Sequence, residues 1–151
     1  MARPLRAEEL AFLHHARVGR LSTVDARNRP SVVPFCFAVL EGDAPVVVSV
    51  LDEKPKRVAD ARLGRVRNIV ANPAVSFVID RYDEDWSQLA FVQVSGQASL
   101  LDPGVAGHTE AIAALRAKYP QYRSMSIDQR TVIVITDLSA FSWRGDGSSF
   151  R

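Results

Sequence analysis

The stretch VGRLSTVDARNRPSVVPFCFAVLEGDAPVVVSVL, residues 18–51, decides the fold class. It contains three runs rich in β-branched and aromatic residues, at 18–24, 31–40 and 46–51, which is the composition typical of β-strands. The polar turns DARNR and EGDAP separate these runs. Connections this short favour antiparallel neighbours, because parallel strands need much longer crossovers. The stretch therefore predicts an antiparallel sheet.

The downstream sequence predicts three further strands, at 74–80, 90–101 and 131–143. Gly96 interrupts the second of them and marks a possible site for a β-bulge. The tail RGDGSSFR, which follows the last strand, is expected to be loose.

Helices are predicted at 7–16, across the segment that begins at Pro55, and at 103–119. The middle helix carries a narrow apolar stripe formed by Ala59, Leu63, Val66 and Val70. With about six strands and two or three helices, we expect a single domain over residues 1–151. Its fold class is mainly β (α+β), a small barrel of antiparallel strands with the helices packed outside it.

Composition excludes several classes of protein. Apolar residues make up 47% of the chain, yet no apolar run approaches the roughly 20 residues that cross a bilayer. The acids Glu8 and Glu9 argue against an export signal, so we expect a cytoplasmic protein. A net charge of +2 gives little support for nucleic-acid binding. The single Cys36 excludes an internal disulfide, and the adjacent His14 and His15 point in different directions on a helix, so no metal site is predicted.

Positive charge is concentrated in one segment, DEKPKRVADARLGRVR (52–67). It holds six cations and three acids, a net charge of +3 in a chain whose total is +2. Cations at a helix entrance repel the partial positive charge of that end, so they are a poor device for stability. They suit an anion-binding socket instead. The alternative is that they are ordinary solvated residues, partly paired with the three acids.

Five motifs carry a resemblance to a known family: GRLSTVDARNRPSVVPFCFAV (19–39), KPKR (54–57), RNIVANPAVSFVID (67–80), YDEDWSQL (82–89) and LRAKYPQY (115–122). With these motifs the chain resembles the flavin/deazaflavin oxidoreductase superfamily, whose split β-barrels include pyridoxamine 5′-phosphate oxidase-like proteins. The KPKR and YDEDW elements resemble the subgroup that uses the deazaflavin coenzyme F420.

The resemblance implies a homodimer with the cofactor in a groove between the two barrels. It implies that cations bind the phosphate-bearing tail of the cofactor, namely Lys54, Lys56 and Arg57, with Arg62, Arg65 and Arg67 as further candidates. It also implies that the ring system lies along the second and third strands, against Val33, Pro34, Phe35, Cys36, Ser49 and Val50. F420 carries a phosphodiester and an oligoglutamate tail, so six cations suit it better than they suit the single phosphate of FMN.

The expected activity is hydride transfer between reduced F420 and a conjugated organic acceptor, with a small molecule as substrate. The alternatives are an FMN-dependent enzyme of the same fold and a non-catalytic carrier of F420, a flavin or haem. No catalytic side chain is nominated, because the cofactor supplies the chemistry.

The remaining candidates each have two interpretations. Tyr82, Asp85 and Trp86 line the substrate entrance or cover the end of the barrel, and Trp143 closes the pocket or caps the core. Pro34 opens its strand toward a cofactor or marks a sheet edge.

Overall fold

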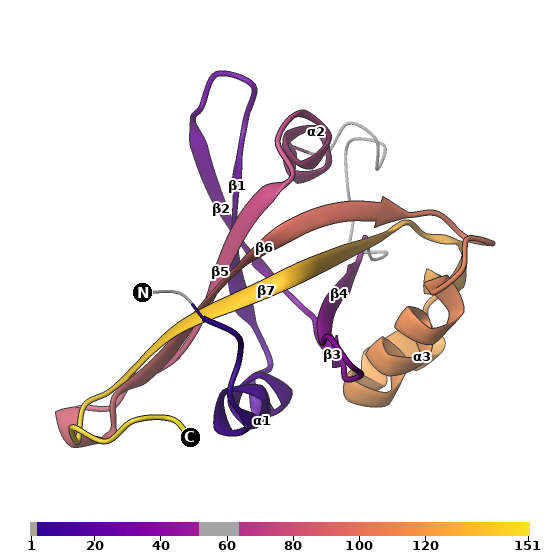
Figure 1. The fold of residues 1–151 in the computed structure, drawn as a ribbon. Helices are drawn as coiled ribbons and strands as arrows, with labels where there is room; N and C mark the ends of the chain where they lie inside the picture. The colour runs from indigo at the N-terminus through magenta and orange to yellow at the C-terminus, as the bar shows by residue number, and fades with distance from the viewer. Residues whose placement is uncertain (1–2, 52–63) are drawn as a thin grey trace.

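Seven antiparallel strands form one sheet in the described part of the chain, which is residues 3–51 and 64–151 of a computed structural model (Figure 1). The strands are β1 (Gly19–Val24), β2 (Pro30–Phe35), β3 (Ala38–Leu40), β4 (Val46–Val50), β5 (Ala74–Arg81), β6 (Ala90–Leu101) and β7 (Val132–Arg144). Their order in the sheet is β2-β1-β5-β6-β7-β4-β3. The predicted antiparallel sheet is confirmed.

The two edge strands of the sheet, β2 and β3, are consecutive in the chain, and Cys36 and Phe37 alone separate them. The sheet therefore curls until its edges meet through this link, which makes a split barrel. The run 31–40, predicted as a single strand, is two strands. The reason lies at Phe37, whose backbone N–H donates to the Tyr119 hydroxyl (3.1 Å), while that hydroxyl lies 3.0 Å from the Phe37 carbonyl. A side chain thus replaces the strand ladder at this position.

Among the described residues, three α-helices lie outside the sheet: α1 (Ala7–His15), α2 (Gly64–Ala71) and α3 (His108–Lys118). Figure 1 shows α1 and α3 near the end of the barrel that holds β3, and α2 beside the β1–β2 hairpin. Short 3₁₀ turns occur at η2 (Trp86–Gln88), η3 (Pro120–Ser124) and η4 (Ile127–Gln129). No helix in the described ranges is long and apolar enough to cross a bilayer.

The core has two parts. Inside the barrel, the rings of Phe35, Phe37 and Phe77 contact one another with centroids 5.2 to 5.7 Å apart. Under α3, Ile112 and Leu115 pack against apolar residues of β4 and β7. Burial of these side chains is the main favourable contribution to folding.

The apolar face of α2 differs from the predicted stripe. Val66 and Ile69 are buried, whereas Val70 is 73% exposed. Val70 follows Ile69 by one position, about 100° around the helix, so the two side chains face different ways. Ala59 and Leu63 lie outside the described residues.

Two local features complete the comparison with the sequence. The pairing of β6 with β7 shifts register between Ser95 and Gln97, so the bulge expected at Gly96 is confirmed. The C-terminal tail, expected to be loose, is anchored. Phe150 is 2% exposed and meets the Phe12 ring edge-to-face at 5.4 Å, because a large apolar side chain near the end of the chain finds a hydrophobic site beside α1.

Candidate functional site

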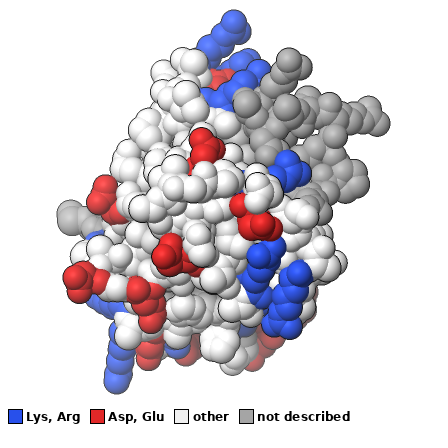
Figure 2. Space-filling view, turned by 90° about the vertical axis from the view of Figure 1, so that its right-hand side faces the viewer, with Lys and Arg blue, Asp and Glu red and all other residues white. Residues whose placement is uncertain are grey.

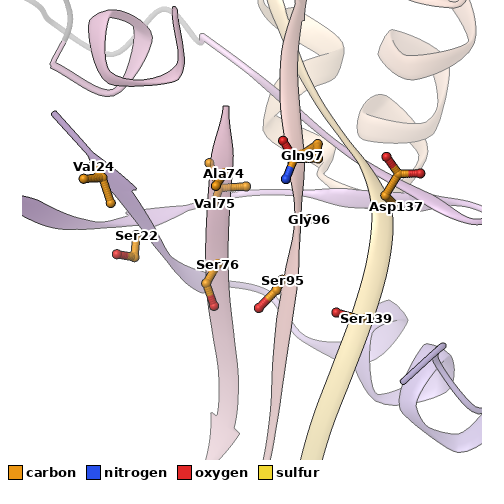
Figure 3. A pocket seen from close by; sticks show the side chains of 10 residues that line it. All are labelled: Ser22, Val24, Ala74, Val75, Ser76, Ser95, Gly96, Gln97, Asp137 and Ser139. Carbon is orange, nitrogen blue, oxygen red and sulfur yellow. The ribbon is translucent and has the colours of Figure 1, made fainter. Parts of the chain in front are cut away.

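One face of the sheet is hollowed across β1, β5, β6 and β7 (Figure 3). Four serines, one on each strand, occupy the same level of this hollow. They are in register, with Ser22 opposite Ser76, Ser76 opposite Ser95 and Ser95 opposite Ser139. Their side chains are small, which leaves a trough of about 410 Å³ that crosses the strands. We call it the serine hollow; the other residues lining it are Val24, Ala74, Val75, Gly96, Gln97 and Asp137.

The same face continues toward the far end of the sheet. A second hollow shares Ser22 and Ser76 with the first and extends over Arg20, Val32 and Gln93. Beyond it lies an aromatic row, in which Phe91 stands opposite Trp143 with ring centroids 6.1 Å apart. Along the strands, this face therefore changes from serine residues, through a mixture of polar and apolar residues, to aromatic residues.

A basic cavity lies just beyond the end of β1. It has a volume of about 540 Å³ and lies between the β1–β2 turn and α2. We call it the arginine cleft; it is lined by Asp25, Ala26, Arg27, Arg29, Arg67, Asn68 and Ala71. Val24, the last residue of β1, lines the hollow, and the next residue, Asp25, lines the cleft.

Asp25 organises the turn that forms one wall of the arginine cleft. Its carboxylate accepts hydrogen bonds from the backbone N–H of Arg29 (2.9 Å) and of Arg27 (2.8 Å), and from the Arg29 side chain (2.8 Å). These contacts, led by the Arg29 backbone N–H, lower the pKa of Asp25. The carboxylate therefore remains ionised and holds the turn in place.

A family comparison agrees with this architecture. Residues 5–143 match the family model described as pyridoxamine 5′-phosphate oxidase. The chain belongs to this family. The split barrel of the pyridoxamine 5′-phosphate oxidase family, expected from the sequence, is thus confirmed.

Individual relatives of this oxidase-family chain are distant. It is 28% identical, over 102 residues and 67% of each chain, to a 5a,11a-dehydrotetracycline/5a,11a-dehydrooxytetracycline reductase from Streptomyces rimosus. In fold it is similar to a conserved hypothetical protein of Mycobacterium tuberculosis, with a TM-score of 0.73, 20% identity, and coverage of 95% of this chain and 87% of that one. It is also similar to a haem storage protein of Vibrio cholerae, with a TM-score of 0.64, 17% identity, and coverage of 94% and 95%.

The cations predicted to bind the cofactor tail fall partly within the described residues. Arg65 is half-buried and Arg67 exposed, both on α2, and Arg67 lines the arginine cleft. The other predicted cations, Lys54, Lys56, Arg57 and Arg62, lie outside the described residues.

The residues predicted to contact the cofactor ring differ in how deeply they are buried. Pro34 is exposed on the edge strand β2, next to Arg20, which agrees with its interpretation as a sheet-edge proline. Val33 is half-buried against the core. Phe35 and Val50 are 5% and 3% exposed, so in this oxidase-family barrel their side chains belong to the core.

Cys36 and Ser49, also predicted along the ring, are brought together. The buried Ser49 hydroxyl donates a hydrogen bond of 2.7 Å to the Cys36 carbonyl. The Cys36 thiol is free and half-buried, and it packs against the core beneath α3.

The residues predicted around the substrate gather at the far end of β5, β6 and β7. Tyr82 and Trp86 are 66% and 69% exposed, and Trp143 is 45% exposed. Asp85 caps η2, where its carboxylate accepts from the Ser87 N–H (3.1 Å) and hydroxyl (2.7 Å). The backbone of Trp86 lies directly against Gly145, which follows β7.

Within the chain, this aromatic end is far from α2. The whole of β5 separates them, with Ala74 near α2 and Arg81 near Tyr82. At about 3.3 Å per residue, its eight residues span roughly 25 Å. The structure thus assembles the substrate candidates with one another and the described tail candidates with one another, at opposite ends of the sheet.

The serine hollow and the arginine cleft escaped prediction from the sequence. Ser22, Ser76, Ser95 and Ser139 are isolated serines in four separate strands, and only the strand register aligns them. Arg27 and Arg29 lie in a polar turn of ordinary charge. The sequence does not indicate that this turn lies opposite Arg67 of α2.

Proposed function

We propose that this chain is a reductase that uses the reduced deazaflavin coenzyme F420 to transfer a hydride to a conjugated organic acceptor. The observation that carries the proposal is the similarity to the Streptomyces rimosus reductase, an enzyme named for a dehydro compound. Low overall identity leaves the substrate of this chain open to a different small molecule.

The choice of F420 over FMN rests on charge. Arg65 and Arg67 follow the basic KPKR segment, and the arginine cleft adds Arg27 and Arg29 to the cations near α2. Guanidinium groups bind phosphate and carboxylate oxygens through paired, charge-assisted hydrogen bonds. This set of cations fits a cofactor with several negative charges better than one with a single phosphate.

The bound coenzyme would supply the hydride, and the chain's own residues bind and orient the reactants. The cations near α2 fix the tail. We call the sheet face that carries the serine hollow the open face. The exposed Pro34 lies at its edge, where the coenzyme ring would contact it, and proline has no backbone N–H that such a contact would leave unpaired. Phe35, the last residue of β2, anchors that strand in the core.

Homodimerisation completes the proposal. The open face exposes Val32 (62%), Phe141 (47%) and Trp143 (45%), an apolar content that suits burial against a second copy. A two-fold axis pairs the same patch on both subunits. With such an axis across this face, the end of the sheet that holds Trp143 in each copy would lie next to the end that holds α2 in the other copy. Tyr82, Trp86 and Trp143 of each copy would then border the substrate at the other copy's cofactor.

The deciding experiment is a binding titration of the purified protein with F420, FMN and haem, monitored by fluorescence or absorbance. It is repeated for Lys56→Ala and Arg57→Ala, with Arg123→Ala as a control because Arg123 is an exposed arginine of η3, outside the proposed site. We expect F420 to bind most tightly and each of the first two substitutions to weaken it about tenfold, the value of one charge-assisted hydrogen bond. If FMN binds at least as tightly as F420, the FMN-dependent alternative is favoured instead.

An assay of catalytic turnover distinguishes the proposed enzyme from a non-catalytic carrier. With reduced F420 and a panel of conjugated acceptors, including a dehydrotetracycline, we expect oxidation of the coenzyme that depends on the acceptor. Tight capture of haem or F420 with no turnover on any acceptor would identify a carrier.

A further inference from the structure

A cavity of about 560 Å³ lies between α1 and the ends of β5 and β7, and it shares no lining residue with the serine hollow or the arginine cleft. We call it the α1 groove. Apolar residues line it on the α1 side and charged residues on the strand side, chiefly Ala11, Phe12, Ala16, Asp80, Arg81 and Arg144. Its volume and its mixture of apolar surface with a few polar groups are typical of small-molecule sites.

The C-terminal tail holds the two sides of the α1 groove together. Phe12 on α1 meets the buried Phe150 ring edge-to-face at 5.4 Å, and the Arg144 guanidinium lies 4.1 Å from the centroid of the same ring. The tail also pairs with the start of α1, where the Glu8 N–H donates to the Arg151 carbonyl at 2.7 Å. The groove is therefore preformed, which lowers the cost of ordering its side chains when a ligand binds.

One positive charge in the α1 groove is not compensated. Asp80 is paired with Arg20 at 2.9 Å. The Arg81 Nε donates to the Gln88 carbonyl at 2.7 Å, but Arg81 pairs with no carboxylate from residues 3–51 or 64–151. The exposed imidazole of His15 also lines the groove and brings no negative charge to Arg81. An anionic ligand would supply the missing partner.

Arg144 is incompletely paired as well. Its Nε is buried and has no hydrogen-bond partner in the described part of the chain. Its bond to the Glu8 carboxylate is long, at 3.3 Å, and that carboxylate also accepts from the Arg151 N–H at 2.8 Å. A guanidinium whose side chain is only 32% exposed gains from a further charged acceptor, because water satisfies it poorly there. Two underused arginines thus line one cavity.

We infer that the α1 groove is a second small-molecule site, which binds an apolar acid with one anionic group. The apolar body would contact Phe12 and the alanines of α1, and the carboxylate or sulfonate would bind Arg81 and Arg144. The inference depends neither on the coenzyme nor on its tail.

The α1 groove lies behind the residues proposed to border the substrate. Successive residues of a strand point to opposite faces, so Arg144 lies behind the face that exposes Trp143. Arg81 holds the turn η2, which contains Trp86, through its bond to the Gln88 carbonyl. An acid in the groove would therefore bind to side chains that also position the aromatic end of the sheet.

The test uses two fluorescent probes that share one aromatic body. Anilinonaphthalene sulfonate carries a single negative charge, and phenylnaphthylamine is the same skeleton without the sulfonate. Both probes brighten in an apolar site, so a titration of the full chain gives the affinity for each. Their difference measures what the anionic group contributes.

Two variants address the two halves of the α1 groove. Ala11→Phe fills the groove from an exposed position of α1, and Arg81→Gln removes the unpaired charge. The matched controls are Ala117→Phe, at an exposed alanine of α3, and Arg123→Gln, at an exposed arginine of η3. Figure 2 faces the side of the molecule that holds α3, where acidic and basic side chains both occur.

We expect the wild type to bind the sulfonate about tenfold more tightly than the neutral probe, the value of one charge-assisted hydrogen bond. Arg81→Gln should remove most of that difference and leave the neutral probe within about twofold. Ala11→Phe should weaken both probes about tenfold or more, because it occupies their space. Both controls should follow the wild type, and thermal unfolding checks that each variant retains the fold.

Three results would overturn the inference. Unchanged binding by Ala11→Phe would place the probes on another surface. Equal wild-type affinity for the two probes would show that the site does not select an anion. An equal loss of sulfonate binding in Arg81→Gln and Arg123→Gln would reflect net charge alone. None of these results bears on the binding of F420, so the proposed function is tested separately.

Discussion

The buried carboxylate of Glu9 grips the guanidinium of Arg3 with both oxygens, at 2.6 and 2.9 Å. Glu9 has no exposed surface, and it also accepts from the Arg6 N–H (2.7 Å) and from the Ser142 hydroxyl (2.6 Å). Through this one side chain, the segment before α1 is fastened to β7. The Arg3 backbone continues the attachment by pairing with Ala140.

Replacing Glu9 with glutamine should destabilise the protein by about 2 kcal/mol, because the buried side chain loses the charge that strengthens its hydrogen bonds to the partly exposed Arg3 guanidinium. Urea unfolding followed by circular dichroism measures the change. The control is Glu110→Gln, an exposed acid in the first turn of α3, which should change the free energy of unfolding by no more than about 0.5 kcal/mol. Equal effects of the two substitutions would show that the buried cluster adds no particular stability.

The same residue should make stability depend on pH. Burial acts to raise the pKa of Glu9, but the hydrogen bonds from Arg3, Arg6 and Ser142 outweigh it and lower the pKa to about 2. Since the unfolded value is 4.5, the stabilisation is present above that pH and is lost as pH falls toward 2. The stability difference between wild type and Glu9→Gln should therefore shrink across this range. A difference that stays constant down to the lowest pH would contradict the assignment.

Lys118 should titrate well below an ordinary lysine. Burial, and then repulsion from Arg17, lowers its pKa to about 8, and its ammonium lies 4.0 Å from the centroid of the Phe37 ring. A nuclear magnetic resonance titration of the lysine side chains should show one midpoint near 8, which Lys118→Met removes. The unfolded chain, with a pKa of 10.5, holds this proton more tightly, so stability should rise as pH increases from about 8 to about 10. A midpoint above 10 for every lysine would refute the prediction.

Gly96→Ala should be costly, whereas Gly42→Ala should not. A Cβ at position 96 would stand 2.6 Å from the Thr136 carbonyl oxygen and 2.7 Å from the Ile135 side chain, whereas a Cβ at position 42 meets nothing within 4 Å. Overpacking of this kind typically costs about 1–3 kcal/mol. Thermal unfolding of the two variants, measured side by side, gives the comparison, and a similar midpoint for both would mean that the bulge adapts readily.

Val32→Lys should separate the proposed dimer into monomers. Val32 is 62% exposed on the open face, and a charge at that position would be buried by a second copy. Val105→Lys is the control, because Val105 is exposed (49%) in the turn before α3. Light scattering during size-exclusion chromatography reports the mass of each variant. A dimer that survives Val32→Lys would require the copies to meet through another surface.

Much of the fold could be predicted because its signals are local. The alternation and β-branched content of residues 18–51 mark strands wherever they occur, and short turns force antiparallel neighbours. Gly96 as a bulge and Pro34 at a sheet edge follow from backbone chemistry that each residue carries with it. Errors arose where a distant group intervened, as at Phe37, where the Tyr119 hydroxyl divides a predicted strand in two.

The sequence by itself determined most of the strand and helix segments, and where positive charge concentrates along the chain. Only the tertiary structure decided which residues of distant segments meet. It aligns four serines across four strands, places the arginines of a turn opposite those of a helix, and buries a glutamate beside β7. The physical reason is that strand, turn and helix preferences depend on each residue and its neighbours in the sequence, whereas register and packing depend on which distant segments meet.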